Sequence, residues 1–107
     1  MPNRSKPKAS PRPKVSVGVS WYEESEWLRV KSAATDPELF EATFGEWLAM
    51  AEDAVVAMHK AGINPVKVLI KANDLLPWCL MHNKENNAAA RAEFVSELLR
   101  LRNEGGA

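Results

Sequence analysis

The stretch Thr35–Gly62, TDPELFEATFGEWLAMAEDAVVAMHKAG, has the strongest helical pattern of the chain. Its apolar side chains recur at steps of three and four residues, and its acidic side chains fall on the opposite side of a helix. Asp36 can cap the N-terminus, Pro37 suits the first helical position, and Gly62 supplies the left-handed residue that ends many helices. The stretch therefore predicts one core helix of roughly 25 residues.

Two short segments show the alternation of a half-buried β-strand. Val15–Val19 places valines at every second position, and Val66–Ile70 repeats this pattern. Gly18 interrupts the first segment and indicates either a bulge or a close backbone approach. Because a lone strand leaves its backbone groups unpaired, the two segments should pair with each other, or each should pair across a dimer.

Ser20 and Glu23 have the spacing of a capping box, which predicts a helix over residues 21–34. The expected order is then strand, helix, long helix, strand, short helix, helix. This order defines an α+β fold that is predominantly helical, with four helices and a minimal two-stranded sheet. The alternative is an all-α fold in which both strand segments are extended loops.

Of the two remaining helices, one is expected from residue 75 to about residue 82, and the other after its cap to about residue 103. Their candidate caps are Asn73 or Asp74 for the first, and Asn86 or Asn87 for the second. Pro77 is tolerable in the shorter helix only if it lies in the first turn.

The length of 107 residues fits one domain. We expect a disordered, basic, proline-rich arm over 1–14, a single globular domain over 15–103 and a flexible tail over 104–107. One cysteine excludes an intramolecular disulfide and fits a reducing compartment, so a cytoplasmic location is expected. No run approaches the roughly 20 apolar residues of a membrane span, so no membrane partner is expected.

The N-terminal arm holds five bases and no acid, which leaves nine bases against fourteen acids in the rest of the chain. These bases are candidates for contacts with nucleic-acid phosphates: Arg4, Lys6, Lys8, Arg12 and Lys14. Five phosphate contacts would support only weak, salt-sensitive binding, and no aromatic residue is interleaved for base stacking. A solvated tail is the main alternative.

Cys79 and His82 lie three positions apart on the predicted short helix, beside Trp78. A metal site would need more ligands than one cysteine and two histidines supply, so neither a metal nor a cofactor is expected. A nucleophilic thiol would need a group that orients the imidazole, and the sequence shows none. Cys79 is therefore expected to be a small buried residue of the core, and no catalytic residue is assigned.

Arg91 projects between two apolar stripes of the last helix. Its guanidinium should reach a carboxylate, either Asp36 or Asp74, as a structural ion pair or as part of an anion site. A helix that packs against one core needs one apolar stripe, and this helix has two. It is therefore either sandwiched between elements or meets a second subunit. A ligand site would combine this arginine with Trp78, Cys79 and His82.

Several short motifs together resemble a group of small bacterial proteins of unassigned function. They are SWYEESEW (20–27), TDPELFEATFGEWLAMAE (35–52), AG (61–62), PWC (77–79) and ARAEFV (90–95). The resemblance implies a bacterial, cytoplasmic protein and brings no catalytic residues.

Three functions are hypothesised from the sequence. The first is a non-enzymatic protein-interaction module that acts as a homodimer, and the second is a small-ligand or anion-binding domain, which could be an enzyme. The third is weak nucleic-acid binding through the arm.

Overall fold

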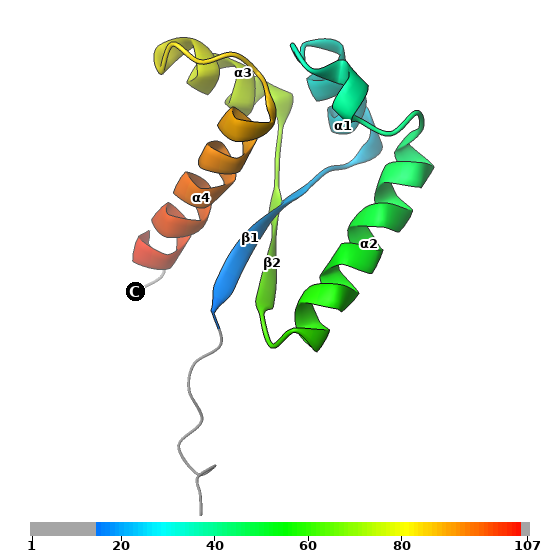
Figure 1. Cartoon of the computed structure of the whole chain (residues 1–107). Helices are drawn as coiled ribbons and strands as arrows, with labels where there is room; N and C mark the ends of the chain where they lie inside the picture. Colours follow the sequence, from blue (N-terminus) through cyan, green and yellow to red (C-terminus); the bar gives the residue numbers. More distant parts are fainter. Residues whose placement is uncertain (1–14, 106–107) are drawn as a thin grey trace, which may run out of the picture.

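The computed structural model describes residues 15–105, which form an α+β fold dominated by helices (Figure 1). Its elements are β1 (Ser16–Trp21), α1 (Glu24–Ser32), the 3₁₀ helix η2 (Pro37–Leu39), α2 (Phe44–Lys60), β2 (Asn64–Leu69), α3 (Ala72–Met81) and α4 (Ala88–Gly105). The predicted order of strands and helices is confirmed, and the all-α alternative is wrong. The arm over residues 1–14 lies outside the described residues, so its predicted disorder stays a prediction.

The two predicted strands pair with each other within one chain. They run parallel, with Ser16 opposite Asn64 and Trp21 opposite Leu69. Parallel strands need a long crossover connection, and here the segment from α1 to α2 supplies it. The alternative in which each strand pairs across a dimer is therefore not needed.

The sheet lies between α4 on one side and α2 on the other (Figure 1). A Cβ atom added to Gly18 would lie 2.7 Å from Cγ1 of Val95, so this residue faces α4 at close range. Trp21 is an odd number of positions away and faces the opposite side, where its ring centroid lies 5.3 Å from that of Trp47 in α2. A close approach is therefore found at Gly18, but its neighbour is a side chain of α4 rather than another backbone segment.

One hydrophobic core joins the sheet to the helices. Its largest fully buried side chains are Trp27 and Val30 of α1, Ile70 directly after β2, and Leu75 of α3. Burial of such side chains stabilises the fold by about 1.5 to 3 kcal/mol each. Cys79 belongs to this core, as predicted.

The predicted single helix over Thr35–Gly62 is wrong, because the chain is extended at Phe40, between η2 and α2. Thr43 caps α2 by accepting a hydrogen bond of 3.1 Å from the backbone amide of Glu46. Thr43 is therefore a second helix start signal within the apolar pattern of Thr35–Gly62. Gly62 follows the helix with a φ of +80°, which confirms its predicted left-handed role.

The predicted capping box of Ser20 and Glu23 is also wrong. Ser20 belongs to β1, and α1 begins at Glu24 without a side-chain cap. Pairing with β2 extends the strand through Trp21, so the hydroxyl at position 20 cannot reach the start of the helix.

The start of α3 is capped from another helix, not by Asn73 or Asp74. The backbone amide of Ala72 donates a hydrogen bond of 2.7 Å to the carboxylate of Glu26 in α1. Because α3 begins earlier than expected, Pro77 lies in its interior rather than in its first turn.

The start of α4 follows the prediction more closely. Oδ1 of Asn87 accepts a hydrogen bond of 2.9 Å from the amide of Ala90, which is a local cap. The helix continues to Gly105 and so enters the segment that was expected to be a flexible tail. No helix within residues 15–105 has the length and apolar character that a membrane crossing requires.

Candidate functional site

Arg91 lies at the centre of a polar cluster that joins α4 to the loop before η2. Its guanidinium donates hydrogen bonds of 3.0 Å to each carboxylate oxygen of Asp36, and another of 2.9 Å to Oδ1 of Asn86. The ring of Phe40 lies under the guanidinium, with 4.6 Å between Cζ and the ring centroid. Of the two predicted carboxylate partners, the structure selects Asp36.

Asp36 and Asn86 are themselves fixed by further contacts. The second oxygen of Asp36 accepts a hydrogen bond of 2.8 Å from the amide of Ala88, and the side-chain amide of Asn86 donates to the carbonyl of Val30 at 3.0 Å. The hydrogen bond from Arg91 holds the pKa of Asp36 below its ordinary value. Because Asp36 and Asn86 occupy the guanidinium, the cluster has a structural role. It links α4 to α1 and to the loop before η2.

The residues predicted around Cys79 lie on α3 and at its end. The ring centroids of Trp78 and His82 are 4.6 Å apart, and Nε1 of Trp78 donates to the carboxylate of Glu97 in α4 at 3.2 Å. Cys79 is buried in the core, and burial raises the pKa of its thiol. Thus Trp78 and His82 are in contact, whereas the hydrogen-bonding partners of Arg91 lie on other elements.

Within residues 15–105, no group of three histidine, cysteine, aspartate or glutamate side chains is placed so that it could hold a metal ion. The basic residues of the predicted nucleic-acid arm, positions 4 to 14, lie outside the described part of the chain.

The outer face of α3 carries the most exposed large apolar side chains of the described residues. Leu80 and Met81 expose 83% and 82% of their surface, and Pro77 is exposed one turn earlier. Positions 77, 80 and 81 share one side of a helix. These three side chains are called the α3 face below.

The two edges of the sheet differ in their capacity to bind another strand. The amide of Asn64 donates to the carbonyl of Val15, and the amide of Ile70 donates to that of Trp21. In a parallel pair the backbone groups alternate between the two edges, so Ser16, Gly18 and Ser20 direct theirs away from β2. This free edge of β1 has no strand neighbour within residues 15–105.

The outer edge of β2 is poorly suited to pairing. By the same alternation, Pro65 and Lys67 direct their backbones outward there. Proline offers no N–H group, and an edge lysine is a common obstacle to strand addition.

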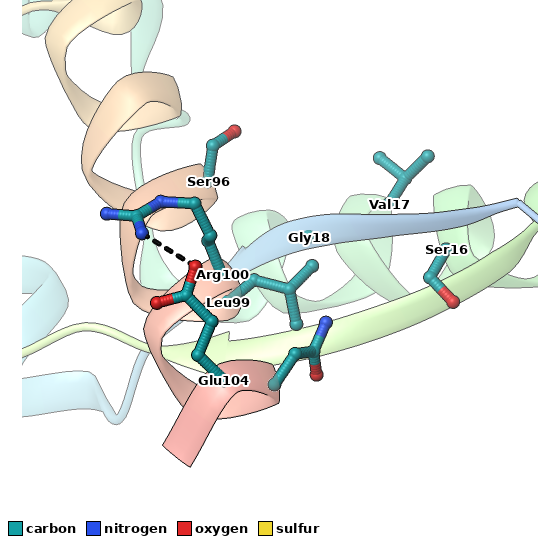
Figure 2. A pocket seen from close by; sticks show the side chains of 8 residues that line it. Ser16, Val17, Gly18, Ser96, Leu99, Arg100 and Glu104 are labelled. Carbon is teal, nitrogen blue, oxygen red and sulfur yellow. Dashed lines mark hydrogen bonds and ion pairs between the residues drawn. The ribbon is translucent and has the colours of Figure 1, made fainter. Parts of the chain in front are cut away.

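Two grooves follow the free edge of β1, and neither is lined by a residue of β2. The first has a volume of about 600 Å³ and separates Ser16–Gly18 from the C-terminal half of α4 (Figure 2). Arg100 and Glu104 lie on its α4 wall and form an ion pair of 2.9 Å with each other.

The second groove, of about 260 Å³, continues along β1 between Ser20 and the facing parts of α2 and α4. Its apolar lining includes Tyr22, Trp47 and Met50, while Ala92 contributes a small side chain from α4. The two grooves and the edge between them are called the β1 trough below.

No family model, curated protein or solved structure matches this chain. The resemblance to small bacterial proteins therefore stays a prediction.

Sequence patterns did not identify the β1 trough or the α3 face as candidate sites. The free edge could have been suspected from the small residues at positions 16, 18 and 20, which contrast with the proline and lysine of the other strand segment. The α3 face could not, because Leu80 and Met81 look like core residues until the packing of α3 is known.

Proposed function

We propose that this chain is a non-enzymatic protein-interaction module that acts as a homodimer. The observation that carries the proposal is the α3 face, where two adjacent apolar side chains are each more than four-fifths exposed. Burial of apolar surface is the main favourable term in protein association.

A second copy of the chain suits the α3 face because the face is apolar. In a two-fold contact the same patch of each copy meets the other, so an apolar patch is complementary to its own copy. Pro77, Leu80 and Met81 form such a patch. The opposite side of α3 is occupied, since Trp78 packs on Phe94 of α4 with ring centroids 5.3 Å apart.

A non-enzymatic role is favoured by the state of the residues that could carry chemistry. The guanidinium of Arg91 is engaged by Asp36 and Asn86, and the thiol of Cys79 is buried with a raised pKa. A cytoplasmic location fits the proposal, because a lone thiol stays reduced there.

The test is the mass of the chain in solution, measured by light scattering at high micromolar concentration. We expect about twice the chain mass of 11.9 kDa for the wild type, and a return to the single-chain mass for Leu80→Glu and Met81→Glu. Val56→Glu is the matched control, because Val56 is an exposed apolar residue of α2, away from the α3 face. A wild-type mass near 11.9 kDa, or equal effects of all three substitutions, would contradict the proposal.

A further inference from the structure

We propose that the β1 trough binds one extended segment of a protein partner, which adds to the sheet as a third strand beside β1. The segment is net basic and seats an apolar side chain among Tyr22, Trp47 and Met50. The inference rests on the proposed role as an interaction module, but it does not depend on the homodimer.

The first support is the unused hydrogen-bonding capacity of the edge. Ser16, Gly18 and Ser20 each direct one N–H and one C=O away from β2, in the spacing that an added strand requires. Main-chain pairing of this kind gives affinity, and side-chain pockets give specificity.

The second support is the space beside the edge. The two grooves of the β1 trough lie end to end along the strand, one at Ser16–Gly18 and one at Ser20. Residues of α4 line both grooves, while Trp47 and Met50 of α2 line the second groove only. A strand placed there would be covered by helices, as parallel strands usually are.

A second copy of this chain cannot supply the added strand by antiparallel pairing of its own β1, which would leave both α4 helices on the same face of the joined sheet. Because α4 lies directly over Gly18, pairing of β1 with its copy at about 4.8 Å would bring two α4 helices to a similar separation. Packed helices need about 8 to 10 Å between their axes. The outer edge of β2 is excluded as a donor by Pro65, as described above.

The charge of the described residues favours a basic partner. They contain nine bases against fourteen acids. Glu41 lines the second groove and forms no ion pair within residues 15–105, whereas Arg91, on the same groove, is neutralised by Asp36. A net-basic segment would therefore be attracted to the trough.

The apolar seat distinguishes a partner from the chain's own N-terminal arm. The arm is basic, but beyond its initiator methionine its only apolar side chain apart from proline is Ala9. Three prolines, at positions 7, 11 and 13, also remove N–H groups from the part nearest β1. The arm thus lacks the larger apolar side chain that the second groove accepts.

The experiment selects peptides from a displayed library of random decapeptides on the full chain. We expect binders that are enriched in lysine or arginine and carry a leucine-sized or aromatic residue. Ser16→Pro should weaken their binding about tenfold, because it removes an outward N–H group without altering the ladder to β2. Ser16→Ala is the matched control, because it keeps that group.

A second pair of variants tests the apolar seat. Ala92→Lys should weaken binding by filling the second groove from the exposed side of α4. Ala89→Lys adds the same charge to the same helix away from both grooves and should leave binding unchanged. Failure to select any binder, or binders indifferent to Ser16→Pro and Ala92→Lys, would overturn the proposal.

Amide hydrogen exchange distinguishes a partner peptide from the two other possible occupants of the β1 trough, which are the N-terminal arm and a second copy of the chain. We expect the amides of Ser16, Gly18 and Ser20 to exchange fast in the free chain and to be protected by a selected peptide. Two results would overturn the proposal. Protection in the free chain that disappears when residues 1–14 are deleted would assign the trough to the arm. Protection that rises with protein concentration would assign it to a second copy. Peptide binding by Leu80→Glu would show that a failed homodimer does not remove this site.

Discussion

The guanidinium of Arg91 donates a hydrogen bond of 3.0 Å to each carboxylate oxygen of Asp36, across 55 positions of sequence. Their side chains are only 10% and 13% exposed. This bidentate pair ties the first turn of α4 to the loop that separates α1 from α2.

Replacing Arg91 with alanine should destabilise the fold by about 3 kcal/mol, because it leaves the largely buried carboxylate of Asp36 without its partner. Urea unfolding measures the change. Arg100→Ala is the matched control, since Arg100 forms an exposed pair with Glu104 and should cost less than about 1 kcal/mol. Equal losses for the two variants would contradict a structural role for Arg91.

Stability should fall in acid through the titration of Asp36. The hydrogen bond from Arg91 lowers the folded-state pKa of Asp36, so its contribution is present above the ordinary aspartate pKa of about 3.9. The contribution is lost as the pH falls through the folded-state value. Unfolding measured from neutral pH to acid should therefore show a shallower acid loss for Asp36→Asn than for the wild type. Parallel curves for the two proteins would refute this account.

Tyr22 should ionise at unusually high pH. Burial raises its pKa from 10.0 to about 12, and it is the only tyrosine, so its ultraviolet absorbance reports it alone. Because the unfolded state loses its proton first, the free energy of unfolding should fall by roughly 1.4 kcal/mol per pH unit from 10.0 to about 12. Tyr22→Phe should lack this component, and a titration midpoint near 10 would contradict the burial.

Gly18→Ala should destabilise the fold by about 1 to 3 kcal/mol through overpacking, because its Cβ would lie 2.7 Å from Cγ1 of Val95. Val95 is buried in α4, where a β-branched side chain has little freedom to move. Val95→Ala removes the obstructing methyl group and should also destabilise the chain by opening a cavity. In the double variant the two losses should partly cancel, and a thermodynamic cycle measures this coupling. If the two changes in the free energy of unfolding simply add, the contact between position 18 and Val95 does not cause the loss in Gly18→Ala.

The thiol of Cys79 should react slowly in the folded protein, because burial shields it and raises its pKa. The measurement is the rate of labelling by a disulfide reagent such as Ellman's reagent, with the chain unfolded in urea as the reference. Rapid labelling under native conditions would place Cys79 at the surface and reopen the hypothesis of a reactive cysteine.

Local patterns predicted the type and order of the elements because each depends on residues within one or two turns. The valine alternation located both strands, and Gly62 ended α2 because a left-handed conformation favours glycine wherever the helix packs. The same reasoning failed at Ser20, where pairing with Val68 of β2 extends the strand past the apparent cap. It failed also at Thr35–Gly62, where two valid start signals competed.

The sequence by itself determined an α+β chain with two strands, four helices, a buried cysteine and an arginine in need of a carboxylate. Only the tertiary structure decided which carboxylate this is, that Glu26 caps α3 from 46 positions away, and that α4 covers Gly18. It also decided which apolar side chains stay exposed on α3 and which edge of the sheet stays open. The reason is physical: periodicity depends on neighbours along the chain, whereas these contacts depend on which distant surfaces pack together.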